Sequence, residues 1–142
     1  SMADTYLNDM AERMAANSEA AVMQLVNGSL VAATPYNNGN NEDFVKVNPA
    51  AAKAKDCTGG VSCSRTELAA YDLATWQNNV GAVMPGAAFR IRNTGGLLQP
   101  RLVEIILAWT PNKDGEEVDL SEGCDVSSSS LSVQCRVLLK ML

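Results

Sequence analysis

The chain has 142 residues, of which 46% are hydrophobic and 19% are charged, and its net charge is −5. This length and apolar content predict one globular domain and argue against global disorder. The acidic balance and the lack of a long basic run disfavour binding to a nucleic-acid backbone. The sequence contains no histidine, which excludes catalysis or metal binding that depends on an imidazole.

The first expected element is a helix over residues 3–26. Small and apolar residues recur at three- and four-residue steps, namely Leu7, Met10, Ala11, Met14, Ser18, Ala21, Val22 and Leu25. Asn27-Gly28 is a stop signal, and Asn17-Ser18 is an alternative, earlier end point. Residues 1–2 are expected to be a remnant of expression.

Residues 34–63 are rich in Asn, Gly and Pro and predict a loop region. A second, short helix is expected over residues 64–84. It begins at the capping-box pattern of Ser64 and Glu67, and Pro85-Gly86 ends it. Its expected buried residues are Ala69, Leu73, Trp76, Val80 and Val83. Its expected water-facing residues are Glu67, Asp72, Thr75, Gln77 and Asn79.

The pattern changes to strand-like alternation in residues 87–142. The alternating segments are AAFRIRN, LVEIILAWT and SVQCRVLLKML, which predict three strands of an antiparallel meander. Val103, Ile105, Leu107 and Trp109 share one predicted face; Val133, Cys135, Val137 and Leu139 share another. An acidic loop joins the last two strands. The expected fold is one α+β domain over residues 1–142, with the long N-terminal helix packed on the antiparallel sheet.

The four cysteines fall into two local pairs, Cys57 with Cys63 and Cys124 with Cys135. Neither spacing is typical of a zinc knuckle, and no redox C-x-x-C motif is present. Four cysteines allow three pairings, of which we favour the two nearest-neighbour bridges. Disulfides imply an oxidising, extracytoplasmic compartment. The first bridge would fasten the loop region, and the second would close the acidic loop onto the last strand.

No residue pattern predicts an active site, a cofactor site or a metal site, so we do not expect an enzyme. The serines Ser127–Ser130 have no histidine base. The acidic loop lacks the ligand order of a calcium loop and is expected to be solvated, with a weak cation site as the alternative. Its carboxylates are Asp114, Glu116, Glu117, Asp119, Glu122 and Asp125.

The paired glycines and the tryptophans also have structural explanations. Gly59-Gly60 and Gly95-Gly96 lie outside phosphate-binding motifs and predict turns. Trp76 and Trp109 lie on predicted inward faces, so we expect them to pack in the core rather than to form a binding patch.

Four stretches, in this order, resemble minor pilins of the PilV family of type IV pili. DMAERMAAN resembles the end of their N-terminal helix, and DLATWQNNVGAVMPGA resembles their second helix. VEIILAWTP and CRVLLKML resemble their central and last strands. The family begins with a prepilin peptidase site and a hydrophobic membrane segment, neither of which is in this sequence. We therefore expect the chain to be the periplasmic part of such a protein, without its N-terminal transmembrane half-helix.

The resemblance implies a structural role without catalysis. A minor pilin helps to initiate or cap pilus assembly and so supports motility, adhesion or DNA uptake. The implied partners are other minor pilins and major pilin subunits, together with the inner membrane through the missing segment; no direct nucleic-acid contact is expected. The implied location is the periplasmic side of the inner membrane, and then the cell-surface pilus. The alternatives are a minor pseudopilin of a type II secretion system and a small periplasmic ligand-binding domain.

Overall fold

The alternating segments of the C-terminal half form the central sheet. The computed structural model describes residues 2–32, 35–37, 43–110, 124 and 133–142. Strands β4 (Ala88–Asn93), β5 (Leu102–Trp109) and β6 (Gln134–Met141) pair antiparallel in chain order, so the predicted meander is confirmed. A two-residue strand, β3 (Val45–Lys46), pairs with β4 and completes the sheet order β3-β4-β5-β6.

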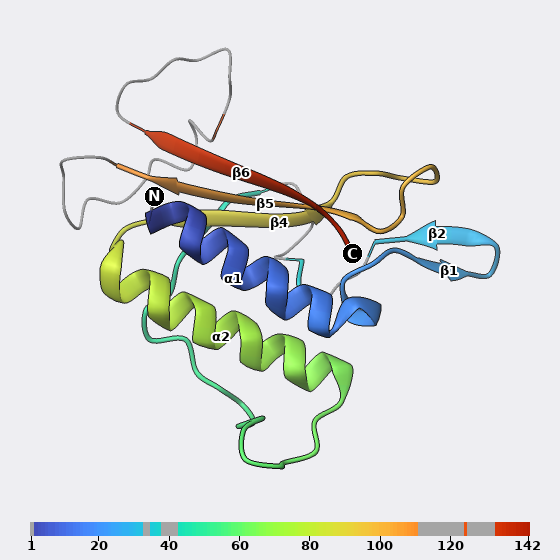
Figure 1. Cartoon of the computed structure of the whole chain (residues 1–142), viewed down its shortest axis with the longest axis horizontal. Coiled ribbons are helices and arrows are strands. Elements are labelled where there is room, and N and C mark those ends of the chain that lie inside the picture. Colours follow the sequence, from blue (N-terminus) through green and yellow to red (C-terminus); the bar gives the residue numbers. More distant parts are fainter. Residues whose placement is uncertain (1, 33–34, 38–42, 111–123, 125–132) are drawn as a thin grey trace.

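Two helices, α1 (Met2–Ala16) and α2 (Arg65–Val83), lie on the same side of this sheet (Figure 1). The core between helices and sheet is built from the apolar faces of both. Its fully buried members include Leu7, Met10, Met14, Trp76, Val80, Ile91, Val103, Ile105 and Leu107. Trp76 donates from Nε1 to the carbonyl of Tyr6 at 2.8 Å and stands edge-on to Phe89. The mixed helix-and-sheet class is therefore as predicted.

The first helix is shorter than expected, because it ends at Ala16 and not near residue 26. The alternative end point at Asn17-Ser18 is the one that the chain uses. The Asn17 side chain donates to the Tyr36 hydroxyl at 3.1 Å and to the Arg65 carbonyl at 2.9 Å. These bonds hold Asn17 at φ −132° and ψ 44°, outside the helical range. A short 3₁₀ turn, η1 (Ser18–Ala20), follows.

Residues that were expected to continue the helix form a hairpin instead. Strands β1 (Gln24–Val26) and β2 (Ser29–Val31) pair antiparallel, and Leu25 is 72% exposed. Asn27 and Gly28, predicted to stop a helix, are the two-residue turn between the strands, with φ of 51° and 81°. Positive φ at both positions is the hairpin geometry that Asn-Gly favours.

The second helix begins as predicted, but it is the longer of the two, with 19 residues against 15. Both reciprocal bonds of the capping box between Ser64 and Glu67 are present. Ala69, Trp76 and Val80 are buried as expected, whereas Val83, in the last turn, is 47% exposed.

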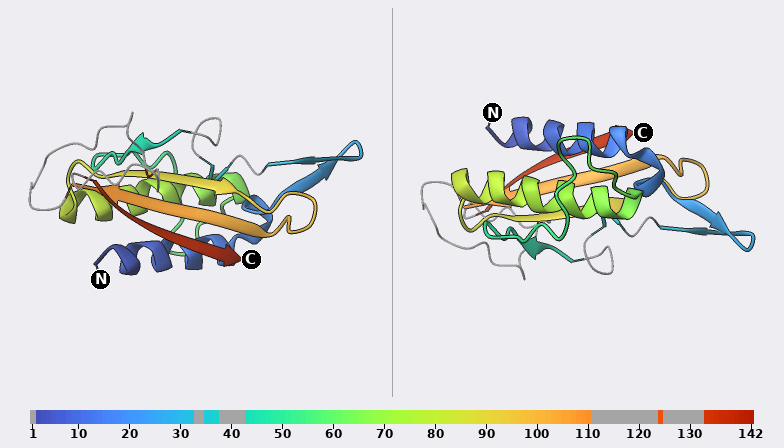
Figure 2. Two further views of the ribbon diagram at one scale, coloured as in Figure 1. Left: turned by 90° about the horizontal axis from the view of Figure 1, so that it is seen from above. Right: turned by 90° about the horizontal axis from the view of Figure 1, so that it is seen from below.

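Residues 48–63 run as a strap across the outer side of α2 (Figure 2). The backbone N–H of Asn48 donates to Gln77 Oε1 at 3.0 Å, and Asn78 Nδ2 donates to the Pro49 carbonyl at 3.0 Å. Pro49 packs so closely on Gly81 that a Cβ there would lie 2.5 Å from the Pro49 Cβ. The predicted loop region is thus fixed to the helix over much of its length.

The other face of the sheet carries a small charged cluster and apolar side chains. Arg90 and Arg92 both contact Glu104, at 3.2 Å and 2.8 Å. On β6, Val137 and Leu139 are more than half exposed on this face, while Leu138 packs toward the helix side. The apolar face that alternation predicted for β6 is therefore the one directed away from the helices.

Replacement of Gly81 by Ala tests the strap. Alanine normally stabilises a helix by about 1 kcal/mol relative to glycine. Here the new methyl group would collide with Pro49, so we expect Gly81→Ala to lower the free energy of unfolding by about 1–3 kcal/mol. Urea unfolding followed by tryptophan fluorescence measures this. The control Asn79→Ala, at an exposed position of α2, should gain a few tenths of a kcal/mol. An increase in stability for Gly81→Ala would show that the strap does not press on α2.

Candidate functional site

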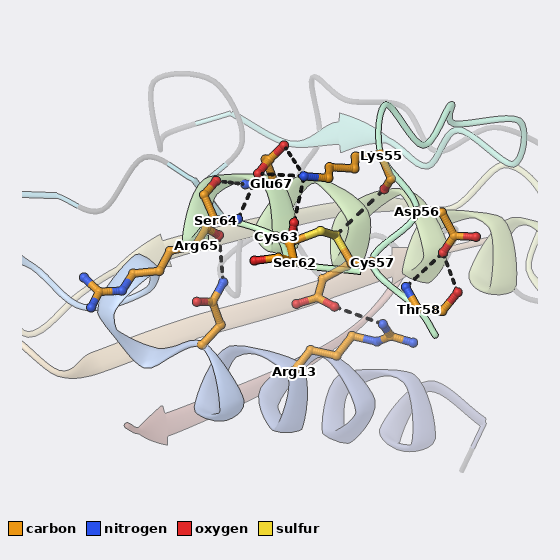
Figure 3. Close-up of a disulfide and its surroundings, with 12 residues drawn as sticks. Arg13, Lys55, Asp56, Cys57, Thr58, Ser62, Cys63, Ser64, Arg65 and Glu67 are labelled. Carbon is orange, nitrogen blue, oxygen red and sulfur yellow. Dashed lines mark hydrogen bonds and ion pairs between the residues drawn. A yellow bond between two sulfur atoms is a disulfide. The ribbon is translucent and has the colours of Figure 1, made fainter. Parts of the chain in front are cut away.

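The structure pairs Cys57 with Cys63, which closes a small ring directly before α2 (Figure 3). The two Cα atoms are 5.9 Å apart, within the normal range for a disulfide. Closing a ring of this size stabilises the folded chain by about 2 kcal/mol in the loop-entropy estimate. The ring therefore delivers the end of the strap to the start of the helix.

Lys55 joins the ring to the helix. Its Nζ donates to the Ser62 carbonyl at 2.7 Å and lies 3.2 Å from Glu67 Oε2. Directly before the ring, Asp56 Oδ1 accepts from the hydroxyl of Thr58, a ring residue, at 2.6 Å and from the Thr58 N–H at 3.0 Å. The bond from the Thr58 hydroxyl, followed by the bond from the Thr58 N–H, lowers the pKa of Asp56. Side chains on both sides of the disulfide thus restrict the ring conformation.

Glu67 is the acceptor shared by the ring and the helix cap. Its Oε1 accepts from the backbone N–H of Ser64 at 2.8 Å, and its own N–H donates to Ser64 Oγ at 3.1 Å. The bond from the Ser64 backbone, followed by the bond from Lys55, lowers the pKa of Glu67. The negative charge also lies at the positive end of the helix dipole.

A polar cluster connects α1 to α2, and we call it the α1–α2 joint: the partly buried Arg13 and the buried Asn17, Tyr36 and Asp72. Asp72, on α2, is only 5% exposed. It accepts from Arg13 Nη1 at 3.1 Å and from the Tyr36 hydroxyl at 2.5 Å. Burial, followed by the bond to Asp72, raises the pKa of Tyr36 far above its ordinary value. Arg13 also holds Asp9 at 3.1 Å, one turn earlier on α1.

The prediction that Asp72 faces water is wrong. Its position on α2 points toward α1, where Arg13 and the Tyr36 hydroxyl supply donors that satisfy its charge. A carboxylate can be buried when it is paired in this way. The periodicity of one helix cannot indicate a partner that lies 59 residues away in the chain. Only the opposite charges of Arg13 and Asp72 could have suggested this contact.

The second disulfide lies on the sheet. Cys124 pairs with Cys135 of β6, and their Cα atoms are 6.0 Å apart. Both cysteines pack against buried Ala88 and Ala108, on the face away from the helices. The serines Ser127–Ser130 and the six carboxylates of the acidic loop lie outside the described residues, and so does the alternative of a cation site there.

The described residues do not assemble a recognisable metal centre. No group of three or more metal-ligating side chains occurs within them. A surface hollow of about 310 Å³ lies beside the hairpin, with Val26, Val31, Glu19 and Arg65 among its lining residues; Glu19 and Arg65 form an ion pair with each other. The contacts described above connect the two helices with each other, with the strap and with the sheet.

The remaining candidate residues occupy structural positions. Trp76 is fully buried, and Trp109 packs partly buried against the core. Gly59, Gly60 and Gly96 adopt positive φ, as expected for turns. A Cβ on Gly95 would lie 2.0 Å from the Gln99 carbonyl oxygen, so the turn between β4 and β5 requires glycine there.

Comparison with known proteins identifies no relative: no protein family, curated protein or solved structure matches the chain. Across the part of the chain that the structure describes, no helix has both the length and the hydropathy that a membrane crossing requires.

Removal of the Asp72 carboxylate tests the α1–α2 joint. Asp72→Ala leaves the Arg13 charge and the Tyr36 hydroxyl without their shared acceptor, and we expect a loss of about 2–3 kcal/mol of unfolding free energy. The matched control Asp9→Ala removes the other carboxylate that contacts Arg13, at a more exposed site, and should cost less than about 0.5 kcal/mol. Chemical denaturation of both variants measures the difference. Equal losses would mean that the buried contact adds nothing beyond a surface ion pair.

The charge of Glu67 should affect how the free energy of unfolding depends on pH in the acidic range. The pKa of Glu67 in the folded protein lies below the ordinary value of 4.5. Ionised Glu67 therefore stabilises the protein fully above pH 4.5, and this stabilisation is lost as the pH falls through the pKa of the folded state. Glu67→Gln keeps a capping side chain but should flatten this part of the profile, so that the two proteins converge in acid. Denaturation at a series of pH values tests this, with Glu12→Gln on α1 as control. Parallel profiles for wild type and Glu67→Gln would refute it.

Proposed function

We propose that the chain is the extracytoplasmic head of a minor pilin, a structural subunit that helps to initiate or cap a type IV pilus. The single observation that carries this proposal is the packing of α1 against strands β5 and β6 of the antiparallel sheet, with its buried stripe formed by Leu7, Met10 and Met14. A pilin-like head requires this arrangement, in which the helix that continues toward the membrane is held by the sheet.

The start of α1 is compatible with that role. α1 begins at one end of the helix pair (Figure 1), and Ala3, in its first turn, is 2% exposed. The hydrophobic half-helix that the proposal requires would join α1 at this point. The α1–α2 joint, near the other end of α1, would then hold the anchored helix firmly to the rest of the head when force acts along it.

The two disulfides support an extracytoplasmic location. Such a subunit also needs surfaces for its neighbours in the filament. Leu97 and Leu98, in the turn between β4 and β5, are 82% and 95% exposed. Val137, Leu139 and Met141 of β6 are each more than half exposed. In this proposal these apolar side chains are contact positions for other minor pilins and for the major pilin.

Site-specific photo-crosslinking in cells that make the full-length protein tests the proposal. Crosslinkers at Leu98 and Leu139 should capture pilin subunits, whereas one at Asn79, an exposed position of α2, should capture fewer. Fractionation should place the protein in the inner membrane and in sheared pili, with all four cysteines oxidised. Reduced thiols in a cytosolic fraction, or no crosslink to any pilin, would reject the proposal. Capture of secretion pseudopilins instead would favour the alternative assembly.

A further inference from the structure

The β1–β2 hairpin is weakly attached to the rest of the protein. It extends away from the sheet and the helices (Figures 1 and 2), and its ladder has three residue pairs. At its base, the Met23 N–H donates to the Pro100 carbonyl at 3.0 Å, and Gln24 Nε2 donates to the Glu19 carbonyl at 3.1 Å. A two-stranded hairpin with so few anchors opens more readily than a larger sheet.

The turn of this hairpin holds a chemically reactive pair. Asn27 and Gly28 are both exposed, and apart from the two chain neighbours of Gly28, no atom lies within 4 Å of where a Cβ on Gly28 would stand. Among the described residues, Asn27 is the only non-glycine residue with a positive φ. The backbone nitrogen of a glycine that follows asparagine has no side chain to hinder it as a nucleophile.

We propose that Asn27 is a site of spontaneous deamidation that hairpin opening controls. The Gly28 backbone nitrogen attacks Cγ of Asn27 and forms a new C–N bond. The bond from Cγ to the side-chain amide nitrogen breaks, and that nitrogen leaves as ammonia with the proton from the Gly28 N–H. Water then opens the resulting succinimide ring at one of its two carbonyls. The product is aspartate or isoaspartate; water is consumed and no oxidant or reductant is needed.

The closed hairpin should slow this reaction. The attack requires Asn27 to rotate its backbone and side chain until Cγ meets the Gly28 nitrogen. The pairing of Val26 with Ser29 holds the two turn residues in a different conformation, with both φ values positive. Reaction therefore proceeds mainly from molecules whose hairpin has opened, and its rate reports the open fraction.

The two products affect the hairpin differently. Asp-Gly suits the same turn as Asn-Gly, so an aspartate product keeps the hairpin and adds a negative charge. Isoaspartate routes the main chain through the side chain and inserts one carbon atom into a turn of fixed length. The pair of Val26 with Ser29 can then no longer form. Because Val26 and Val31 line the hollow beside α2, isoaspartate removes one wall of it irreversibly. This inference is independent of the pilin proposal.

Peptide mapping by mass spectrometry during incubation at neutral pH tests the inference. The native protein should deamidate at Asn27 about five- to thirtyfold more slowly than the urea-unfolded chain, as expected for a marginally stable hairpin. Val31→Gly, which weakens β2, should bring the native rate within about twofold of the unfolded rate. The control Val137→Gly makes the same change on an exposed position of β6 and should leave the rate at Asn27 unchanged. In the unfolded chain, Asn38-Gly39 provides an internal reference for the intrinsic rate.

The products are distinguished by amide exchange of Val26 and Ser29, the hydrogen-bonded pair next to the turn. Asn27→Asp should keep the exchange protection of the hairpin, and the isoaspartate fraction of aged protein should lose it. Equal rates in the native and unfolded protein would show that the hairpin gives no control. No deamidation of native Asn27, or no effect of Val31→Gly, would show that hairpin opening does not supply the reactive state. Any of these results overturns the inference.

Discussion

The buried carboxylate of Asp72 is the constraint on which the arrangement of helices depends. It receives hydrogen bonds from Arg13 of α1 and from Tyr36, so three separate parts of the chain meet at one charge. An unpaired charge in this position would be costly, and the need to satisfy it selects one register of α1 against α2. Asn17 extends the same network to the Arg65 carbonyl, in the first turn of α2. The polar contacts specify the geometry, while the apolar core supplies most of the stabilising free energy.

A long segment without helix or strand, residues 48–63, is held against α2 by side-chain and backbone contacts. The strap of residues 48–63 is held at one end by the contact of Pro49 with Gly81 and at the other by the Cys57–Cys63 ring. Lys55 and Glu67 then connect the ring to the helix cap. The helices and the strap are thus joined on one side of the molecule, whereas β6 and the β4–β5 turn expose apolar side chains.

The features that were predictable from sequence are those encoded within short segments. Ser64 and Glu67, three positions apart, form the capping box. Strands β4, β5 and β6 can be predicted from the alternation of apolar and polar residues within each segment. The features that were missed depend on distant partners or on short elements. Asn27-Gly28 is compatible both with a helix stop and with a hairpin turn, and the helical spacing of Ala21, Val22 and Leu25 favoured the wrong choice. Strand β3 has two residues, too few for any periodicity.

By itself, the sequence determined the buried face of β5, the start of α2, the three main strands and the adjacency of the cysteines that form each disulfide. These follow from local sterics, hydrogen bonds over a few residues and alternation of hydrophobicity. Only the tertiary structure decided where α1 ends, that Asp72 is buried, and which face of β6 remains exposed. Each of these depends on a contact between groups far apart in the chain, which outweighs the local preference of the residue. Asn17 leaves the helix because Tyr36 and Arg65 accept hydrogen bonds from its side-chain amide. Asp72 is buried because Arg13 donates a hydrogen bond to it.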